Sequence, residues 1–274
     1  MQITLLGTGS PIPHPDRAGP ATLIRAGDQQ LLFDCGRAVV MRLAAAGLMD
    51  LNALTALLIT HLHSDHTTAL SDVLTTRWIF QEGPDPLRVL GPQGTQEYCD
   101  GVLAAMAQDI RYRVAHHADL NHEPECAVTE VSEGVVFDEG GVVVRAALVD
   151  HGPVRPALSY RVEHDGKSVV ISGDTVPCEG LDRLCAGADA YVQTVLRRSV
   201  VEAVPRARLQ DILTYHSDLE GAGLTAARGG VGTLVLTHQM FPPQPGGEQE
   251  WIDEVGEVYD GDVVWGEDLL TIEV

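Results

Sequence analysis

The sequence predicts a mixed α/β fold in which two mixed β-sheets pack together and carry helices on their outer faces. Short apolar segments rich in β-branched residues alternate with helical patterns from one end of the chain to the other. The dipeptide Asp165-Gly166 lies between two strand patterns and predicts a tight hairpin, and therefore an antiparallel pair. Hairpins combined with helical connections imply mixed sheets with helices outside them.

The individual elements follow from these patterns in order. Strands are predicted at residues 2–6, 21–26, 30–34, 55–59, 87–90, 141–149, 157–163, 168–172, 189–193, 232–236, 262–265 and 268–273. Helices are predicted at residues 37–47, 68–80, 93–108, 179–186, 218–229 and 248–257. Residues 116–126 form the most loop-like segment, and its His116, His117 and His122 are either solvated or part of a cap over a site.

Potential metal-ligand residues are spread from residue 61 to residue 238, so one site would have to gather most of the chain. We therefore expect one domain, residues 1–274. We expect neither a signal peptide nor a membrane span, because the chain has no matching apolar run. Five scattered cysteines without C-x-x-C spacing indicate reduced thiols and a cytoplasmic protein.

The chain is strongly acidic, with 18 basic and 39 acidic residues and a net charge of −21. Such a surface repels polyanions at long range, whereas enzymes of nucleic acids usually present a basic face. An organism whose proteins are acidic in general would give the same charge, so this observation has two explanations.

The segment Thr60-His61-Leu62-His63-Ser64-Asp65-His66 carries the clearest chemical signal. It follows the apolar run at residues 55–59 and so lies at the end of a predicted buried strand. Three imidazoles and a carboxylate in so short a stretch suit a cation, and zinc prefers nitrogen and carboxylate oxygen ligands. A polar turn with solvated histidines is the alternative, and it explains the spacing less well.

This segment resembles the metallo-β-lactamase superfamily, and further motifs along the chain match it. They are Leu6-Gly7-Thr8-Gly9-Ser10, Phe33-Asp34-Cys35-Gly36, Val149-Asp150-His151, Ser172-Gly173-Asp174-Thr175 and the strand that ends in Thr237-His238. His216, in Tyr215-His216-Ser217-Asp218, matches an additional histidine of the ribonuclease Z-like group. The run from Gly7 to Pro11, followed by Arg17 to Ala21, is similar to the arylsulfatase-like branch of that group.

The resemblance implies a four-layer αββα sandwich with a dinuclear metal centre. It assigns His61, His63 and His151 to one divalent ion, Asp65, His66 and His238 to a second, and Asp174 to a bridge between them. Zinc is the first choice, while manganese and iron also fit mixed nitrogen and oxygen ligands. A hydroxide shared by the two metals would attack an ester-type substrate.

Other residues receive roles with alternatives. The resemblance gives His216 and Asp65 catalytic roles, with protonation of the leaving group assigned to His216, although His216 could instead serve the following helix. Asp34 is expected to orient a ligand by hydrogen bonds. His14 either lines the pocket or is a solvated loop residue. The cluster Arg197, Arg198, Arg206 and Arg208 either neutralises an anionic substrate or forms a solvated face.

Two departures from the tRNA-processing enzymes of the group set the functional expectation. Gln193 stands where those enzymes carry a glutamate that supports the catalytic histidine, and only 23 positions separate His151 from Asp174, which leaves no room for a long tRNA-gripping arm. We therefore expect a di-metal hydrolase of a small-molecule substrate, an aryl sulfate, phosphodiester or lactone, with no nucleic acid or membrane partner; a homodimer is left open. A tRNA 3′-end endonuclease of the ribonuclease Z type and a non-catalytic metal-binding sensor or scaffold are the alternatives.

Overall fold

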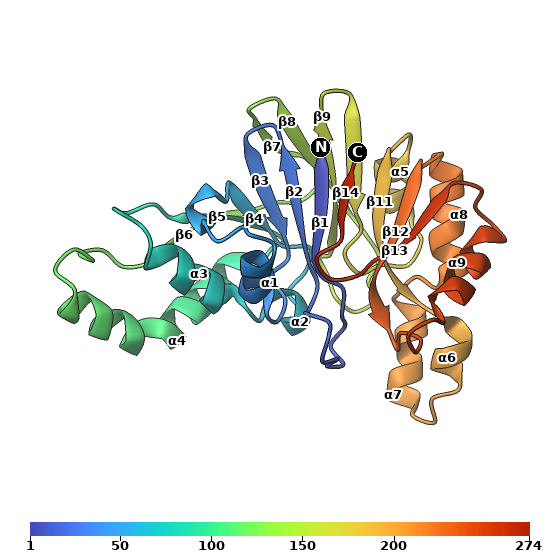
Figure 1. The fold of residues 1–274 in the computed structure, drawn as a ribbon, viewed down its shortest axis with the longest axis horizontal. Coiled ribbons are helices and arrows are strands. Elements are labelled where there is room, and N and C mark those ends of the chain that lie inside the picture. Colours follow the sequence, from blue (N-terminus) through green and yellow to red (C-terminus); the bar gives the residue numbers. More distant parts are fainter.

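The computed structural model describes residues 1–274 and shows two seven-stranded sheets packed face to face (Figure 1). The first sheet has the order β14-β1-β2-β3-β4-β5-β6 and the second the order β13-β12-β11-β10-β9-β8-β7. In each sheet an antiparallel part joins a parallel part, at β3–β4 in the first and β10–β11 in the second. Both sheets are therefore mixed, as predicted.

The strands of the first sheet are β1 (Gln2–Gly7), β2 (Ala21–Ala26), β3 (Gln29–Phe33), β4 (Ala56–Leu58), β5 (Leu87–Gly91), β6 (Cys126–Glu130) and β14 (Thr271–Glu273). Those of the second are β7 (Gly134–Glu139), β8 (Val142–Leu148), β9 (Leu158–His164), β10 (Lys167–Ile171), β11 (Ala190–Leu196), β12 (Thr233–Met240) and β13 (Asp262–Trp265). Asp165 and Gly166 both have positive φ, 50° and 74°, in the turn between β9 and β10. The predicted hairpin is confirmed.

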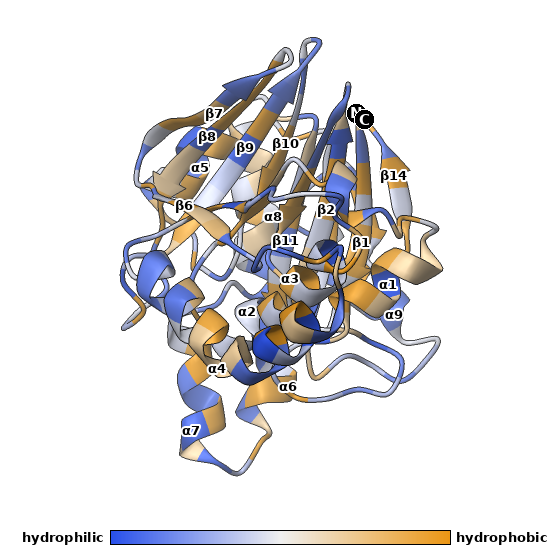
Figure 2. Cartoon of the chain, turned by 90° about the vertical axis from the view of Figure 1, so that its left-hand side faces the viewer, coloured by the Kyte–Doolittle hydropathy of each residue, from blue (hydrophilic) through white to orange (hydrophobic).

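Helices cover the outer faces of both sheets (Figures 1 and 2). The first sheet carries α1 (Val39–Ala45), α3 (Leu70–Trp78) and α4 (Thr95–His116), and the second carries α5 (Glu179–Cys185), α8 (Leu219–Gly229) and α9 (Glu248–Gly256). Short helices α2 (Ser64–Thr67), α6 (Arg198–Glu202) and α7 (Ala207–Gln210), with the 3-10 turns η1 (Leu51–Ala53) and η2 (Asp211–Thr214), complete the set. None of the helices has both the length and the apolar character needed to cross a membrane.

Three apolar clusters account for the layers. Along β3, Leu31 and Phe33 enter the cluster between the two sheets, whereas Leu32 enters the cluster under α1, α3 and α4, because successive side chains point to opposite faces. A third cluster joins the second sheet to α5, α8 and α9. The predicted four-layer αββα sandwich is confirmed.

Several elements differ from the prediction. The strands β6 and β7 were not predicted; their residues are mostly exposed because each strand ends a sheet, so their apolar pattern is weak. The helix predicted to end at residue 108 continues to His116. The short helices α2, α6 and α7 carry too few residues for a periodic pattern.

Candidate metal centre

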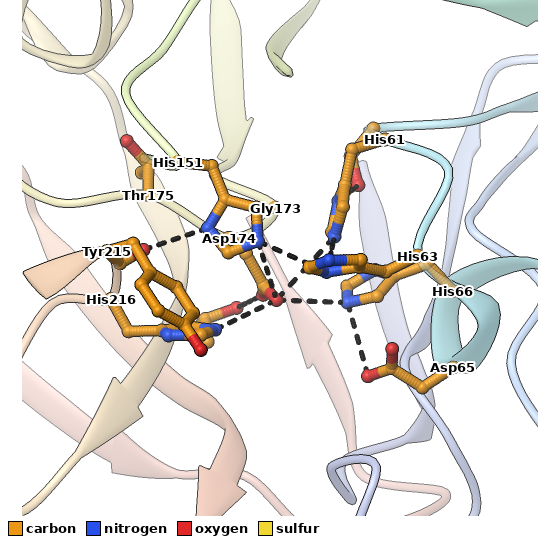
Figure 3. Close-up of polar contacts among 12 residues, drawn as sticks. His61, His63, Asp65, His66, His151, Gly173, Asp174, Thr175, Tyr215 and His216 are labelled. Atoms are coloured by element: carbon orange, nitrogen blue, oxygen red, sulfur yellow. Dashed lines mark hydrogen bonds and ion pairs between the residues drawn. The ribbon is translucent and has the colours of Figure 1, made fainter. Parts of the chain in front are cut away.

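The seven residues predicted as metal ligands converge where the two sheets meet. Figure 3 labels all of them except His238. The segment after β4 supplies His61 and His63, and α2 supplies Asp65 and His66. The second sheet supplies the remaining three: His151 follows β8, Asp174 follows β10, and His238 lies in β12. Strand ends and a one-turn helix thus hold every donor, as the apolar runs before them indicated.

His61, His63, His151 and Asp174 form one group of potential ligands. The His63 Nδ1 atom lies 3.0 Å from His61 Nε2 and 3.2 Å from His151 Nε2. Asp174 Oδ2 lies 3.8 Å from His61 Nε2 and 3.9 Å from His151 Nε2. Three nitrogens and one carboxylate oxygen therefore surround a single point, which is the donor set that zinc accepts.

Asp65, His66 and His238 form a second group. Asp65 Oδ2 lies 3.1 Å from His238 Nε2 and 3.6 Å from His66 Nε2. Asp174 Oδ2 also approaches this group, at 3.3 Å from His66 Nε2 and 3.7 Å from His238 Nε2. One carboxylate oxygen thus lies within 4 Å of both groups, where a bridging ligand would be needed.

The electrostatics of the centre suit cations. Burial lowers the pKa of His61 well below its ordinary value and lowers that of His151 to about 4, so both rings are neutral donors near pH 7. Burial opposes the charge on His66, but the carboxylates of Asp174 and Asp34 outweigh it and raise the His66 pKa well above its usual value. The His66 Nε2 atom is buried without a hydrogen-bond partner and points into the second group, so a divalent ion fits there.

Residues outside the two donor groups hydrogen-bond to the metal-ligand side chains and fix their orientation. Asp34 is buried and accepts from His66 Nδ1 at 2.8 Å and from the Thr60 backbone amide at 2.8 Å. His151 Nδ1 donates to the Tyr215 carbonyl at 2.8 Å, and Thr194 Oγ1 donates to Asp174 Oδ1 at 2.9 Å. Partners of this kind fix the orientation of a ligand, which is the role expected for Asp34.

The backbone around the metal-ligand residues adopts unusual conformations at several positions. Asp34 and His238 have φ values of 59° and 47°, in the left-handed region that non-glycine residues rarely occupy. Gly173 has φ 59°, and a Cβ there would lie 2.7 Å from Thr60 Cβ. Only glycine fits that contact, which brings the loop carrying Asp174 against the loop carrying His61.

His216 lies beside the centre, with its Nε2 atom 3.2 Å from Asp174 Oδ2. Its Nδ1 atom donates to the Ile212 carbonyl at 3.2 Å, so a backbone oxygen in η2 orients the ring. Gln193 takes no part in this, because its side chain bonds to Tyr191 and to the Thr194 carbonyl. Sequence reasoning missed the Ile212 carbonyl, since any residue type offers one.

A cavity of about 140 Å³ opens onto the centre. His63, Asp65, Asp174 and His216 form its polar wall. The opposite wall is mostly apolar and consists of Pro11, Ile12, Leu209, Ile212, Tyr215, Met240 and Phe241, with Ser10 beside them. The cavity can therefore hold a substrate whose reacting group faces the carboxylates and whose flanking part is apolar or aromatic.

The remaining candidate residues lie outside the two donor groups. His14 lines a polar cavity of about 330 Å³, which none of the seven donors touches, and a smaller one of about 50 Å³ that shares Ser10, Ile12 and Phe241 with the cavity at the centre. His116 and His117 are exposed at the end of α4, and His117 lines a surface cavity beside Ile79, so these histidines do not cap the centre. Arg197 and Arg198 make ion pairs with carboxylates, whereas Arg206 and Arg208 are exposed.

Comparison with known proteins gives the family. A family model described as a beta-lactamase superfamily domain matches residues 29–239. The chain is 53% identical to a Ribonuclease Z of Mycolicibacterium paratuberculosis over 276 aligned residues, which cover 100% of this chain and 98% of that protein. It is 51% identical to a Ribonuclease Z of Mycobacterium avium, again over 100% and 98%.

Solved structures agree on the fold. The chain superposes on the metallo-beta-lactamase fold protein YhfI from Bacillus subtilis with a TM-score of 0.76 at 20% identity, covering 100% of this chain and 98% of the other. It superposes on the short form of human tRNase Z with a TM-score of 0.75 at 23% identity, covering 100% and 99%.

These relatives correct the functional expectation. The chain is a metal-dependent hydrolase of ester bonds, as predicted, but the expectation of a small-molecule substrate and of no nucleic acid partner was wrong. Relatives at about half identity over their full length carry the name Ribonuclease Z. The arylsulfatase-like branch remains a prediction.

The misleading features have physical explanations. The aligned relatives match this chain over 98% of their length, so they too have no room for a long additional arm. His216 has a hydrogen-bond partner without a glutamate, because its Nδ1 atom bonds to the Ile212 carbonyl. Net charge describes the whole surface and not the field at one cavity. The matched superfamily domain, the full-length identity and the assembled donor set agree, and the chain belongs to the ribonuclease Z family of the beta-lactamase superfamily.

Proposed function

We propose that the chain is an endonuclease that cleaves precursor tRNA at its 3′ end. The observation that carries this proposal is the 53% identity to a Ribonuclease Z across the whole chain. The cavity supports it, because its polar wall suits a phosphodiester and its apolar wall suits the sugar and base that flank one.

Two divalent ions, zinc by preference, are proposed for the centre. His61, His63 and His151 would hold one and Asp65, His66 and His238 the other, with Asp174 between them. A pair of divalent ions held by these residues would supply an activated water and would polarise the phosphodiester. Because the donors come from both sheets, we also infer that residues 1–274 act as one domain.

The protein's own groups divide the remaining work. Asp34 and Thr194 hold the donors in fixed orientations. His216, oriented by the Ile212 carbonyl, keeps its Nε2 atom beside the reacting centre and delivers a proton to the leaving ribose oxygen. The apolar wall limits the access of bulk water on the opposite side.

The test is cleavage of a precursor tRNA with a 3′ trailer by the metal-loaded protein. We expect a single cut at the 3′ end of the tRNA and no cut in an unstructured RNA of equal length. Asp174→Ala should abolish cleavage, whereas Asp28→Ala, which removes an exposed carboxylate from the β2–β3 turn, should not. Hydrolysis of a nitrophenyl phosphodiester with the precursor left intact would refute the proposal.

A further inference from the structure

The arginine cluster of residues 197–208 divides into two pairs with different surroundings. Arg197 pairs with Glu250 and Glu254 of α9, each at 2.8 Å, and Arg198 pairs with Asp218 at 2.7 Å. These two guanidinium groups are neutralised within the protein.

Arg206 and Arg208 are exposed and make no ion pair with a carboxylate and no side-chain hydrogen bond. Most of the 18 basic residues in this acidic chain are paired with acids, as Arg42, Arg88 and Lys167 are. Two free cations two positions apart are therefore an exception on a surface that otherwise repels polyanions.

The segment that carries these two arginines also contributes to the wall of the active-site cavity. Arg208 directly precedes Leu209, which lines the cavity, and Ile212 of the same segment lines it too. In Figure 1, α6 and α7 project beyond the sandwich, so the segment is open to a large partner. An object that enters the cavity passes close to this segment.

The segment is also held firmly. The Gln210 side chain donates to the carbonyls of Glu202 and Val204, at 3.1 and 2.9 Å, and ties α7 to the turn after α6. Ile212 and Leu213 pack against a small cluster of Leu196, Val201 and Met240. A rigid support of this kind lets an arginine bind with a smaller loss of conformational freedom.

We propose that Arg206 and Arg208 form a phosphate-binding rim that grips the RNA backbone next to the scissile bond. The proposal rests on the proposed function and assigns the RNA contact to these residues. A guanidinium presents paired N–H donors that match phosphate oxygens, and it stays charged at any working pH. Repulsion from the acidic surface elsewhere would direct the polyanion to the one rim where two cations are free.

The experiment compares two double variants of the full-length, metal-loaded protein. Arg206→Gln/Arg208→Gln removes the rim, and Arg111→Gln/Arg113→Gln removes two arginines with the same spacing from α4, on the other helical layer. Both change the net charge equally. Binding of precursor tRNA and its cleavage are measured across a range of KCl concentrations, with nitrophenyl phosphodiester hydrolysis and thermal unfolding as controls.

The rim variant should bind precursor tRNA at least about 10-fold more weakly at low salt. Each lost phosphate contact should reduce the slope of log affinity against log salt by about 0.7–0.9, and the pair by about 1.4–1.8. The α4 variant should keep the wild-type slope, and neither variant should change ester hydrolysis. The melting temperature should stay the same in the rim variant and fall slightly in the α4 variant, which loses the surface ion pair between Arg113 and Asp109. The proposal would be refuted if the salt slope of the rim variant were unchanged, or if both variants lost the same affinity for precursor tRNA.

The rim and the proposed function fail in different ways. If the wild type and both variants cleave precursor tRNA alike, the rim is wrong and the endonuclease stands. If the wild type leaves precursor tRNA uncut but binds RNA through Arg206 and Arg208, the endonuclease is wrong and the rim stands.

Discussion

Replacement of Asp34 by alanine should destabilise the protein and weaken its binding of metal. Asp34 is only 4% exposed and accepts hydrogen bonds from Thr60 N, Thr60 Oγ1 and His66 Nδ1. The Thr60 hydroxyl retains a neighbour in His61 Nδ1 at 3.0 Å, so two buried donors lose their acceptor. The prediction therefore concerns the Thr60 amide and the His66 ring.

The magnitude follows from these two donors and from the backbone. Each stranded donor costs about 1–3 kcal/mol. The φ of 59° at Asp34 adds about 1–2 kcal/mol for alanine, which lacks the polar side chain that tolerates this region. The free energy of unfolding should fall by at least about 3 kcal/mol, and metal affinity should fall by about 10–100-fold because His66 is no longer oriented.

Asp34→Asn separates the two effects. Asparagine tolerates positive φ and keeps one oxygen for the Thr60 amide, but its NH₂ group cannot accept from His66 Nδ1. We expect most of the stability to be retained while metal affinity still falls.

Urea unfolding in the presence of a chelator measures stability, and competition with a chromophoric chelator measures affinity. An alanine variant within about 1 kcal/mol of wild type, with unchanged metal affinity, would refute the reasoning.

Three further predictions concern the metals, the proton donor and the helix layer. Protein purified without chelator should hold close to two ions per chain, and Asp65→Ala or His238→Ala should lose one ion before the other; elemental analysis that stays at one ion under metal-replete conditions would contradict the dinuclear assignment. His216→Ala should slow RNA cleavage by roughly 10²-fold and nitrophenyl ester hydrolysis much less, because nitrophenolate leaves without a proton; equal losses, or a loss of metal, would make His216 a structural residue. Gly180→Ala should lower the melting temperature, because its Cβ would lie 2.0 Å from the Leu148 carbonyl oxygen. The control Gly101→Ala in α4 meets nothing within 4 Å and should stabilise the protein by about 0.5–1 kcal/mol. Equal shifts in melting temperature for the two variants would contradict the packing of α5.

The sequence was most informative where chemistry restricts residue type. Few side chains bind a divalent cation, so His61, His63, Asp65 and His66 in one short segment predicted a metal site that the fold then assembled. Buried strands such as β4 are apolar throughout and were found, whereas the exposed edge strand β6 was not.

The substrate was predicted wrongly because the prediction relied on the types of single side chains and on the overall charge, and neither describes backbone contacts or ion pairs. Gln193 appeared to remove support from His216, yet the support comes from the Ile212 carbonyl. A backbone atom supplied by a 3-10 turn leaves no trace in residue type. In the same way, a net charge of −21 hides which arginines are already paired with acids.

The division of the donors between the two sheets bears on when the enzyme becomes active. The first four donors, His61, His63, Asp65 and His66, follow strand β4 of the first sheet, whereas His238 lies in β12 of the second sheet, 172 positions after His66. A growing chain emerges from its N-terminal end, so the early donors face solvent without their partners during most of synthesis. Because metal binding is coupled to folding, we expect hydrolytic activity to begin only when both sheets have docked, so that a half-made chain would be inactive.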